Sequence, residues 1–338
     1  MRILVRADGS YERGLGHISK QITLCNKLKK SGNKILFVTR RNEVAANLLS
    51  QAGIDHIQID GEVLANIDEI ITSYRPELVV LDILDTSADY VRGLKKHNIR
   101  IVTFDNTDAS ALDCDAVFNV MYYHKKEARE LFKEAAVYEG YKYIIIDEAY
   151  SSVDESKNDN VQRILLTQGG ADTGNRTPFL METLVMLRED TKLPFDVDVV
   201  VGPVFDRDNT SRIEEIASGQ HMFHVQREPD SLALLIEQCD IAITAGGTTM
   251  WEIAACKRPM YVFINESFED ETARLISSLG FALYDGYLPG RDRVNNSLKK
   301  LVEGPALRKE FVQNMKKYDI GNGLNRVIDG IHKHGVSI

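Results

Sequence analysis

The sequence lacks the features that mark secreted, membrane-spanning and disulfide-rich proteins. Its 338 residues include four widely scattered cysteines: Cys25, Cys114, Cys239 and Cys256. They fit no CxxC or metal-ligand spacing and lie in apolar surroundings, so we expect reduced core residues in a cytoplasmic protein. No apolar run approaches the ~18 residues needed to span a bilayer. Charged residues occur within the first six positions, so we expect neither membrane insertion nor secretion.

The sequence also has fewer basic than acidic residues: 41 Lys and Arg against 50 Asp and Glu, which gives a net charge of -9. Such a chain has no overall field that attracts nucleic acid or an anionic membrane. We therefore expect any phosphate group to be bound locally, by a few backbone and side-chain donors.

Common metal and nucleophile motifs are absent as well. The sequence has no HExxH, GxxxxGK[ST] or GxSxG motif, and no DxD-type metal pair in a suitable place. We therefore expect a reaction that needs neither a metal ion nor another cofactor.

The composition is that of a globular protein, with 43% hydrophobic and 27% charged residues. The length corresponds to about two ordinary domains. A chain of this size buries roughly three quarters of the surface that its unfolded form exposes. It therefore has enough core to fold without a disulfide or a structural metal.

Short β-branched apolar runs fill the first half of the chain, each followed by a segment with apolar residues at spacings of three and four. This alternation predicts a parallel sheet covered by helices. The predicted strands are residues 2–6, 34–39, 56–59, 78–83, 100–104, 116–120 and 141–146.

A polar stretch, AYSSVDESKNDN at residues 149–160, breaks this pattern and indicates a linker. The alternation then restarts, with predicted strands at residues 163–167, 196–201, 222–225, 241–244 and 260–264. We predict an N-terminal domain over residues 1–150, a linker over 151–160 and a C-terminal domain over 161–338. In such folds the last helix often crosses back onto the first domain. Both domains are predicted to be doubly wound, Rossmann-like α/β folds that face each other across a cleft.

Open parallel sheets bind ligands at the carboxyl ends of their strands. After the first strand come Asp8, then Gly14 and Gly16, then His17, which opens a helix. Paired glycines let the backbone approach a ligand, and the positive end of a helix dipole keeps a histidine in the first turn neutral. His17 is therefore a candidate general base. The alternative is a tight turn in which His17 touches only solvent.

A dinucleotide-binding motif is disfavoured at this turn. GxGxxG needs a third glycine where this chain has Ser19, and an acidic residue at the end of the second strand, where it reads Thr39-Arg40-Arg41. We therefore expect no nicotinamide cofactor.

A second glycine-rich turn follows the predicted strand at residues 241–244. Gly246, Gly247, Thr248 and Thr249 offer backbone N–H groups and hydroxyls at a helix N-terminus, which suits a diphosphate. Glu252, one turn further on, can accept both hydroxyls of a ribose. The alternative is an ordinary capped helix with Glu252 near the positive dipole end. Because glycines, hydroxyls and an acid occur together, the pattern favours a nucleotide site.

Weaker candidates follow other strands. Gly169 and Gly170 form a further glycine turn directed at the phosphates or the sugar, and Gly202 is a candidate border of the base. Four more polar residues end predicted strands of the first domain: Asp82, Asp85, Asp105 and Asn106. Such residues are common in turns after strands, so a structural role is the alternative to a role in binding.

Two long motifs, RADGSYERGLGH at residues 6–17 and TAGGTTMWEIAA at residues 244–255, carry a resemblance to a known family. The chain resembles the UDP-sugar hydrolases of pseudaminic acid biosynthesis and the related spore coat polysaccharide proteins, which have the GT-B architecture. The resemblance runs from residue 2 to about residue 285. It implies metal-independent hydrolysis of a UDP-2,4-diacetamido-2,4,6-trideoxy hexose at the anomeric carbon, with release of UDP.

The resemblance also implies roles for single residues. His17 would be the base that activates water, with Asp8, Gly14 and Gly16 shaping its pocket. The diphosphate would be held by Gly246, Gly247, Thr248 and Thr249, and the ribose by Glu252. Gly202, the candidate border of the base, completes the predicted UDP-binding residues. The residues near the sugar or the phosphates would be Gly14, Gly16, Lys20, Asn106, Gly169, Gly170, Asn265 and Glu269.

Three positions depart from the family pattern. Lys20 stands where relatives usually have arginine, and Ile83-Leu84-Asp85 replaces a His-Tyr pair after the fourth strand. Residues 265–269 read NESFE where a glutamine is common. These departures leave the identity of the sugar open.

Two other functions stay open on the sequence. A GT-B glycosyltransferase would use the same UDP-sugar loop, but His17 would deprotonate an acceptor hydroxyl instead of water. A noncatalytic protein would bind the sugar nucleotide without turnover, although the intact histidine and phosphate loop argue against it.

Overall fold

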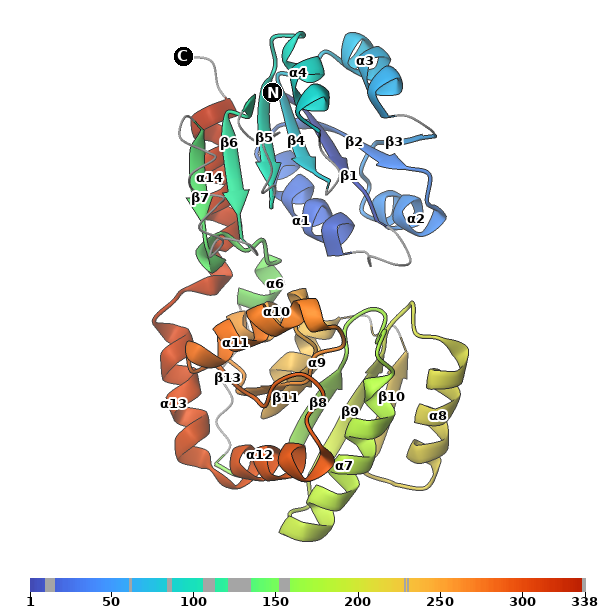
Figure 1. Cartoon of the computed structure of the whole chain (residues 1–338), viewed down its shortest axis with the longest axis vertical. Helices are drawn as coiled ribbons and strands as arrows, with labels where there is room; N and C mark the ends of the chain where they lie inside the picture. The colour runs from blue at the N-terminus through green and yellow to red at the C-terminus, as the bar shows by residue number, and fades with distance from the viewer. Residues whose placement is uncertain are drawn as a thin grey trace. The chain divides into compact units, whose positions relative to one another are not determined.

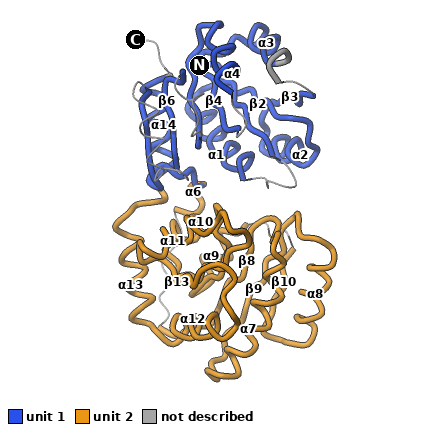
Figure 2. Tube along the Cα trace, in the orientation of Figure 1, with its two compact units in different colours: residues 1–146, 322–338 blue, residues 147–321 orange. Residues whose placement is uncertain are grey.

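The computed structural model describes residues 1–9, 16–60, 63–83, 87–105, 113–120, 135–151, 159–227, 229 and 231–335. Three residues singled out in the sequence, Gly14, Asp85 and Asn106, lie outside these ranges. The chain divides into two compact units, Met1–Ile146 with Asn322–Ile338, and Asp147–Gly321, which Figure 2 colours separately. Each unit is an α/β fold built on a parallel sheet, as the sequence predicts.

The first unit contains a seven-stranded sheet in the order β3-β2-β1-β4-β5-β6-β7. Its strands are β1 (Arg2–Ala7), β2 (Lys34–Arg40), β3 (His56–Ile59), β4 (Leu78–Asp82), β5 (Arg100–Phe104), β6 (Ala116–Asn119) and β7 (Ala136–Glu139). All neighbours pair in parallel. The strand order reverses between β1 and β4, so the topological switch point lies at their carboxyl ends.

Helices cover this sheet. They are α1 (Gly16–Lys30), α2 (Glu43–Gln51), α3 (Val63–Tyr74), α4 (Ala88–Lys95) and α14 (Gly323–Gly335). Apolar residues of α3 and α4, such as Ile67 and Leu94, join Leu4 and Val79 of the sheet in one buried cluster. The last helix, α14, lies beside β6 and β7 in Figure 1 and contacts β5, β6 and α1. It is therefore part of the first unit, although it follows the second in sequence.

The predicted strand at residues 141–146 is wrong. The edge strand is β7, and it is followed by a 3-10 turn, η2 (Tyr141–Tyr143). The apolar residues Ile144, Ile145 and Ile146 are buried all the same. Gly323, the first residue of α14, lies directly against the backbone carbonyl of Ile144, and α14 contacts η2. The start of the apolar run therefore lies against a helix rather than in the sheet.

The second unit contains a six-stranded sheet in the order β10-β9-β8-β11-β12-β13. Its strands are β8 (Arg163–Thr167), β9 (Asp196–Val201), β10 (Phe223–Arg227), β11 (Ile241–Thr244), β12 (Met260–Val262) and β13 (Ala282–Tyr284). All pairs are parallel, and the order reverses between β8 and β11. The short edge strand β13 has no counterpart among the predicted strands.

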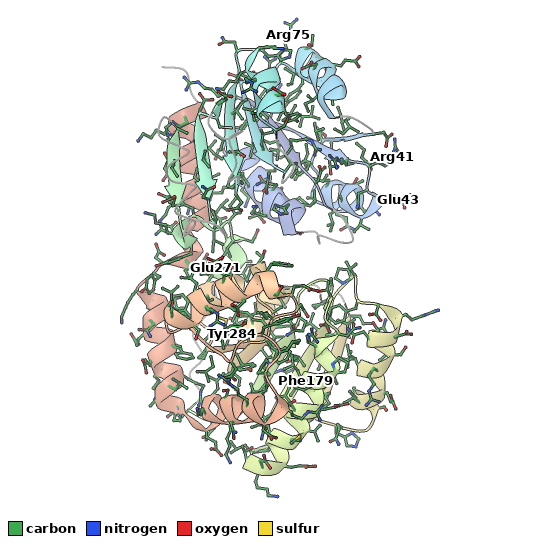
Figure 3. All side chains as sticks on the ribbon, viewed as in Figure 1. Arg41, Glu43, Arg75, Phe179, Glu271 and Tyr284 are labelled. Atoms are coloured by element: carbon green, nitrogen blue, oxygen red, sulfur yellow. The ribbon has the colours of Figure 1, made fainter. Side chains whose placement is uncertain are left out.

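The other elements of the second unit are helices and short turns. They are α6 (Glu148–Ser151), α7 (Arg176–Thr191), α8 (Arg207–Ser218), α9 (Leu232–Gln238), α10 (Thr248–Ala255), η3 (Ser267–Glu269), α11 (Asp270–Ser278), α12 (Arg291–Glu303), α13 (Pro305–Lys316) and η4 (Ile320–Asn322). Phe179 of α7, labelled in Figure 3, packs its ring 5.4 Å from that of Phe263.

The division between the units comes at Asp147, earlier than the linker predicted at residues 151–160. The short helix α6 contacts α10, and the backbone carbonyl of Tyr150 accepts a hydrogen bond from the Cys256 thiol. These contacts bind residues 147–151 to the second unit. Residues 152–158 of the predicted linker lie outside the described ranges.

All four cysteines are buried, as the sequence predicts, and none forms a disulfide bond. Among the described helices, none is both long and apolar enough to cross a membrane.

Candidate active site

His17 lies at the switch point of the first unit, where it contacts a buried carboxylate. The register pairs Ala7 at the end of β1 with Asp82 at the end of β4. The Nδ1 atom of His17 is 2.9 Å from Oδ1 of Asp82. An ionised carboxylate only accepts hydrogen bonds, so Nδ1 donates to Asp82, and in the neutral form of the ring Nε2 is the basic atom.

Asp82 collects donors from one face of α1. Gln21 donates to its Oδ2 at 2.9 Å, and Lys20 lies 3.2 Å from Oδ1 and 3.1 Å from Oδ2. His17, Lys20 and Gln21 share this face because residues three and four apart are neighbours on a helix. Burial opposes ionisation of Asp82, but the charge of Lys20 and the hydrogen bonds from His17 and Gln21 outweigh it and lower the pKa of Asp82 to about 2. Asp82 is therefore a fixed anion that orients the imidazole.

Lys20 is held by two carboxylates. Its ammonium lies 3.2 Å from Asp105 as well as beside Asp82, and 5.4 Å from the centre of the Phe104 ring. Burial disfavours the charged form of Lys20, but the two carboxylates outweigh it and raise its pKa. The sequence predicts Lys20 near the sugar or phosphates, whereas in the structure its charge is engaged inside the first unit.

Asp8 does not take the place beside His17. Its carboxylate accepts two hydrogen bonds from the buried guanidinium of Arg6, at 2.5 and 2.7 Å, and one from the backbone N–H of Arg40 at 2.8 Å. Asp8 thus fixes the ends of β1 and β2. The carboxylate partner of His17 is Asp82, which the sequence pattern assigned to turn chemistry. Gly16 forms the exposed first residue of α1.

The diphosphate loop predicted at residues 246–249 lies at the switch point of the second unit. It joins β11 to α10. Gly247 occupies the N-cap position, so the N-cap residue offers no side chain to accept hydrogen bonds from the first N–H groups of the helix. The first N–H groups of a helix lack intrahelical partners, so this end is suited to bind an anion. The glycine turn at Gly169 and Gly170 follows β8, the strand paired with β11.

Glu252 lies in the first turns of α10 and is partly buried. Burial raises its pKa to about 7, against a hydrogen bond from Thr249 that lowers it. Its carboxyl group is therefore divided between the neutral and ionised forms near neutral pH. A ligand that presents two hydroxyl groups favours the ionised form, because a carboxylate accepts both hydrogen bonds.

Asn265 and Glu269 link the loops of the second unit. The Glu269 carboxylate accepts hydrogen bonds from the backbone N–H groups of Asn265, Glu266 and Gly246. The Asn265 side chain accepts one from the Gly174 N–H at 3.4 Å and donates one to the Gln168 carbonyl at 3.4 Å. The sequence predicts both residues near the sugar, and the structure engages both in holding three loops together.

Gly202 has a steric reason to be glycine. A Cβ atom at this position would lie 2.5 Å from the carbonyl oxygens of both Gly169 and Gly170. Gly169 itself has a φ of +74°, which favours glycine. The absence of a side chain at Gly202 therefore lets the turn at residues 169–170 pack directly against its backbone.

Gly246 and Gly247 offer a matched test of this loop. A Cβ at Gly246 would lie 2.7 Å from the Glu269 Cβ and 3.1 Å from Ile264 Cγ2, whereas at Gly247 the nearest atom is 3.9 Å away. We expect Gly246→Ala to destabilise the protein by about 1–3 kcal/mol through overpacking, and Gly247→Ala to cost less, about 0.5–1 kcal/mol for replacing a glycine N-cap by alanine. Thermal unfolding of the two variants checks this. Equal melting temperatures would contradict the described contact between Gly246 and Glu269.

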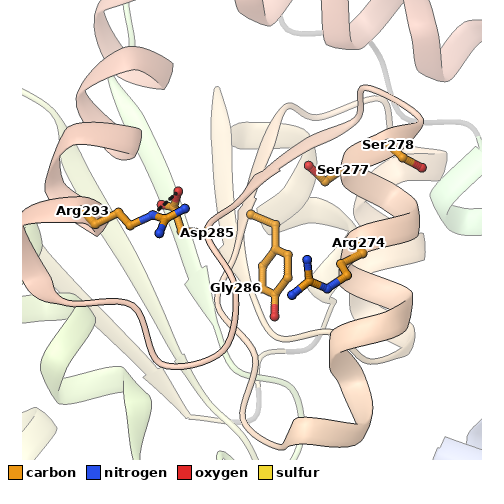
Figure 4. A pocket seen from close by; sticks show the side chains of 7 residues that line it. Arg274, Ser277, Ser278, Asp285, Gly286 and Arg293 are labelled. Carbon is orange, nitrogen blue, oxygen red and sulfur yellow. Dashed lines mark hydrogen bonds and ion pairs between the residues drawn. The ribbon is translucent and has the colours of Figure 1, made fainter.

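A separate cavity of about 550 Å³ in the second unit contains none of the predicted site residues. Its lining residues come from α11, β13, the loop after β13 and α12: Arg274, Ser277, Ser278, Tyr284, Asp285, Gly286 and Arg293. Arg274 is paired with Asp270 at 2.7 Å, and Arg293 with Asp285 at 3.2 Å, a contact dashed in Figure 4. The positive charges of the cavity are thus already balanced.

Within the described ranges, no group of three or more His, Cys, Asp and Glu side chains is arranged to hold a metal ion. No family model matches the chain.

Curated relatives are similar along most of the chain. A protein of Methanocaldococcus jannaschii without assigned function is 27% identical over 98% of this chain and 66% of its own length. The spore coat polysaccharide biosynthesis protein SpsG of Bacillus subtilis is 23% identical over 84% of this chain and 83% of its own. A Campylobacter jejuni protein named UDP-2,4-diacetamido-2,4,6-trideoxy-beta-L-altropyranose hydrolase is 20% identical over 83% and 98%.

Solved structures share the fold. MurG of Acinetobacter baumannii superposes with a TM-score of 0.70 over 98% of this chain and 99% of its own, at 12% identity. The glycotransferase of kitacinnamycin gives 0.69 over 98% of both chains, at 15% identity. The chain therefore has the GT-B fold and is a distant homologue of proteins named for spore coat polysaccharide biosynthesis and for UDP-sugar hydrolysis.

Proposed function

We propose that the protein is a UDP-sugar hydrolase of surface polysaccharide or nonulosonate biosynthesis. In this proposal the second unit binds UDP, with the N-terminus of α10 on the diphosphate and Glu252 on the ribose hydroxyls. The first unit supplies the base, His17. Two distant homologues are named for polysaccharide biosynthesis and for hydrolysis of a UDP-activated diacetamido sugar, which supports this substrate class.

The reaction needs only water and the sugar nucleotide. Nε2 of His17 takes a proton from water as the water oxygen bonds to the anomeric carbon. The bond from that carbon to the diphosphate oxygen breaks, and its electron pair leaves with UDP. The N–H groups of Gly247, Thr248 and Thr249 and the hydroxyl of Thr248 stabilise the charge that develops on the leaving diphosphate. The products are the free sugar and UDP.

The pairing of His17 with Asp82 is the observation that carries the proposal. The carboxylate is 1% exposed, receives three side-chain donors and fixes the imidazole with Nδ1 protonated. A buried aspartate that orients a histidine in this way is the arrangement of a general base. A solvated histidine in a helix turn would need no such partner.

A glycosyltransferase is the second candidate, because the fold is shared with the glycotransferase of kitacinnamycin. The same histidine would then take its proton from an acceptor hydroxyl. The two functions differ in whether UDP is released when the donor and water are the only reactants. Phosphorus NMR of a panel of UDP-sugars, including diacetamido-trideoxy hexoses, tests this. A hydrolase releases UDP without an acceptor; release only after an acceptor is added would identify a transferase.

A further inference from the structure

We infer that Arg176 is the cation that binds the diphosphate of the nucleotide, an inference that rests on the proposed function and assigns a residue to it. Arg176 is the first residue of α7 and follows the loop that begins with Gly169 and Gly170. The sequence patterns do not single it out.

The guanidinium of Arg176 is poorly satisfied. Its Nη2 donates one long hydrogen bond, 3.4 Å, to the backbone carbonyl of Asn265. Its Nε is buried and has no hydrogen-bond partner among the described residues. A buried donor on a charged group costs free energy when it is unpaired. An anionic ligand that accepts hydrogen bonds from this guanidinium removes the cost.

A second group in the same loop is unsatisfied as well. Gln168, at the carboxyl end of β8, is 2% exposed, and neither atom of its side-chain amide has a hydrogen-bond partner in the described parts of the chain. The first backbone donors of α7 are already used, since Asp172 accepts from the N–H groups of Arg176 and Thr177 at 2.7 and 3.0 Å. The side chains of Arg176 and Gln168, rather than the N–H groups at the start of α7, are thus the donors that a ligand can use.

The segments around the predicted diphosphate loop carry more negative than positive charge, so a diphosphate bound there needs a cation. Three fully described segments meet here through Asn265 and Glu269: residues 168–176, 245–249 and 265–269. They carry the carboxylates of Asp172, Glu266 and Glu269, and Arg176 is their one Lys or Arg residue. A diphosphate adds further negative charge, which guanidinium groups bind in a bidentate geometry.

Gly174 holds the guanidinium in position. A Cβ atom on Gly174 would lie 2.8 Å from Cζ and 2.9 Å from Nη2 of Arg176. The side chain of Arg176 therefore folds over Gly174, and an alanine there would push the guanidinium away while leaving the arginine in the chain. Gly174→Ala is thus an independent way to disturb the same group.

Calorimetric titration of the full chain with UDP, UMP and uridine tests the inference. We expect Arg176→Ala to weaken UDP binding roughly 10- to 100-fold, the effect of losing a charge-assisted hydrogen bond, and to leave uridine binding unchanged. Gly174→Ala should weaken UDP binding in the same direction, and Arg176→Lys should restore part of it. Arg188→Ala, in the last turn of the same helix, is the matched control and should bind UDP as the wild type does.

The outcomes separate the inference from the proposed function. If wild type binds UDP and folded Arg176→Ala and Gly174→Ala bind it equally well, this inference is wrong and the proposed function stands. If wild type binds no UDP, the proposed function fails and the inference falls with it. Unchanged uridine binding shows that a variant is folded; should Arg176→Ala not fold, Gly174→Ala decides the question.

Discussion

Replacing Asp82 by asparagine is expected to lower the turnover of UDP-sugar by about 10³- to 10⁴-fold, the scale seen when a histidine base loses its orienting aspartate. Asparagine can donate a hydrogen bond to Nδ1 of His17, which would place the ring proton on Nε2 and remove the basic atom. Acceptor-free release of UDP measures the effect. The KM should change little, because Asp82 is 1% exposed and so has almost no surface that a ligand could contact.

Asp115→Asn is a matched control for this substitution. Asp115 also carries an ion pair inside the first unit, with Lys95 at 2.5 Å, and accepts the Ile101 N–H. It precedes β6 and so lies at the amino ends of the parallel strands, whereas Asp82 lies at their carboxyl ends. Both variants should lose stability, and only Asp82→Asn should lose turnover. Comparable turnover in the two variants would contradict the orienting role of Asp82.

Replacing Glu252 by glutamine is expected to stabilise the free protein and to weaken UDP binding. Burial raises the pKa of Glu252 to about 7 in the folded state, above the ordinary value of 4.5. Between these two pH values the folded state holds more protons than the unfolded state, so the stability of the wild type falls as pH rises from about 4.5 to about 7. Glutamine does not titrate, so the variant should keep the free energy of unfolding that the wild type loses, which is on the order of 1–3 kcal/mol above pH 7.

Urea unfolding at pH 5 and pH 8 checks the stability change, which should be small at pH 5 and full at pH 8. The affinity of the wild type for UDP should rise between pH 6 and pH 8, because the ionised Glu252 accepts both ribose hydroxyls. In Glu252→Gln this rise should vanish and binding at pH 8 should weaken roughly 10- to 100-fold. Glu310→Gln, an exposed acid on α13, is the control for loss of one charge. If Glu252→Gln binds UDP as tightly as the wild type, Glu252 does not hold the ribose.

Local patterns in the sequence predict the fold well because the periodicity of each strand and helix depends on residues that are close together in the sequence. The β-branched runs predict both parallel sheets, and the glycine turns at residues 169–170 and 246–247 stand where strands meet helices. Residues 141–146 mislead because a buried apolar run looks the same whether it pairs with a strand or packs against α14. That distinction depends on Gly323, which lies nearly 180 residues further along the chain.

Contacts between distant segments explain what local patterns miss at the site. Asp82 lies 65 residues from His17, and an aspartate at a strand end gives no local sign of its partner. A signal is present on α1, where His17, Lys20 and Gln21 place three polar groups on a face that turns toward the sheet, which calls for a buried anion. The role of Gly202 is likewise invisible without the carbonyl groups of residues 169–170.

UDP release by wild type and His17→Ala, without acceptor or added metal, is the most direct test of His17 as the base in hydrolysis of a UDP-sugar. We predict release by the wild type and a rate lower by roughly a hundredfold or more in the variant, with unchanged UDP binding in both. Equal rates in the two proteins, or UDP binding by the wild type with no cleavage of any donor, would contradict this role.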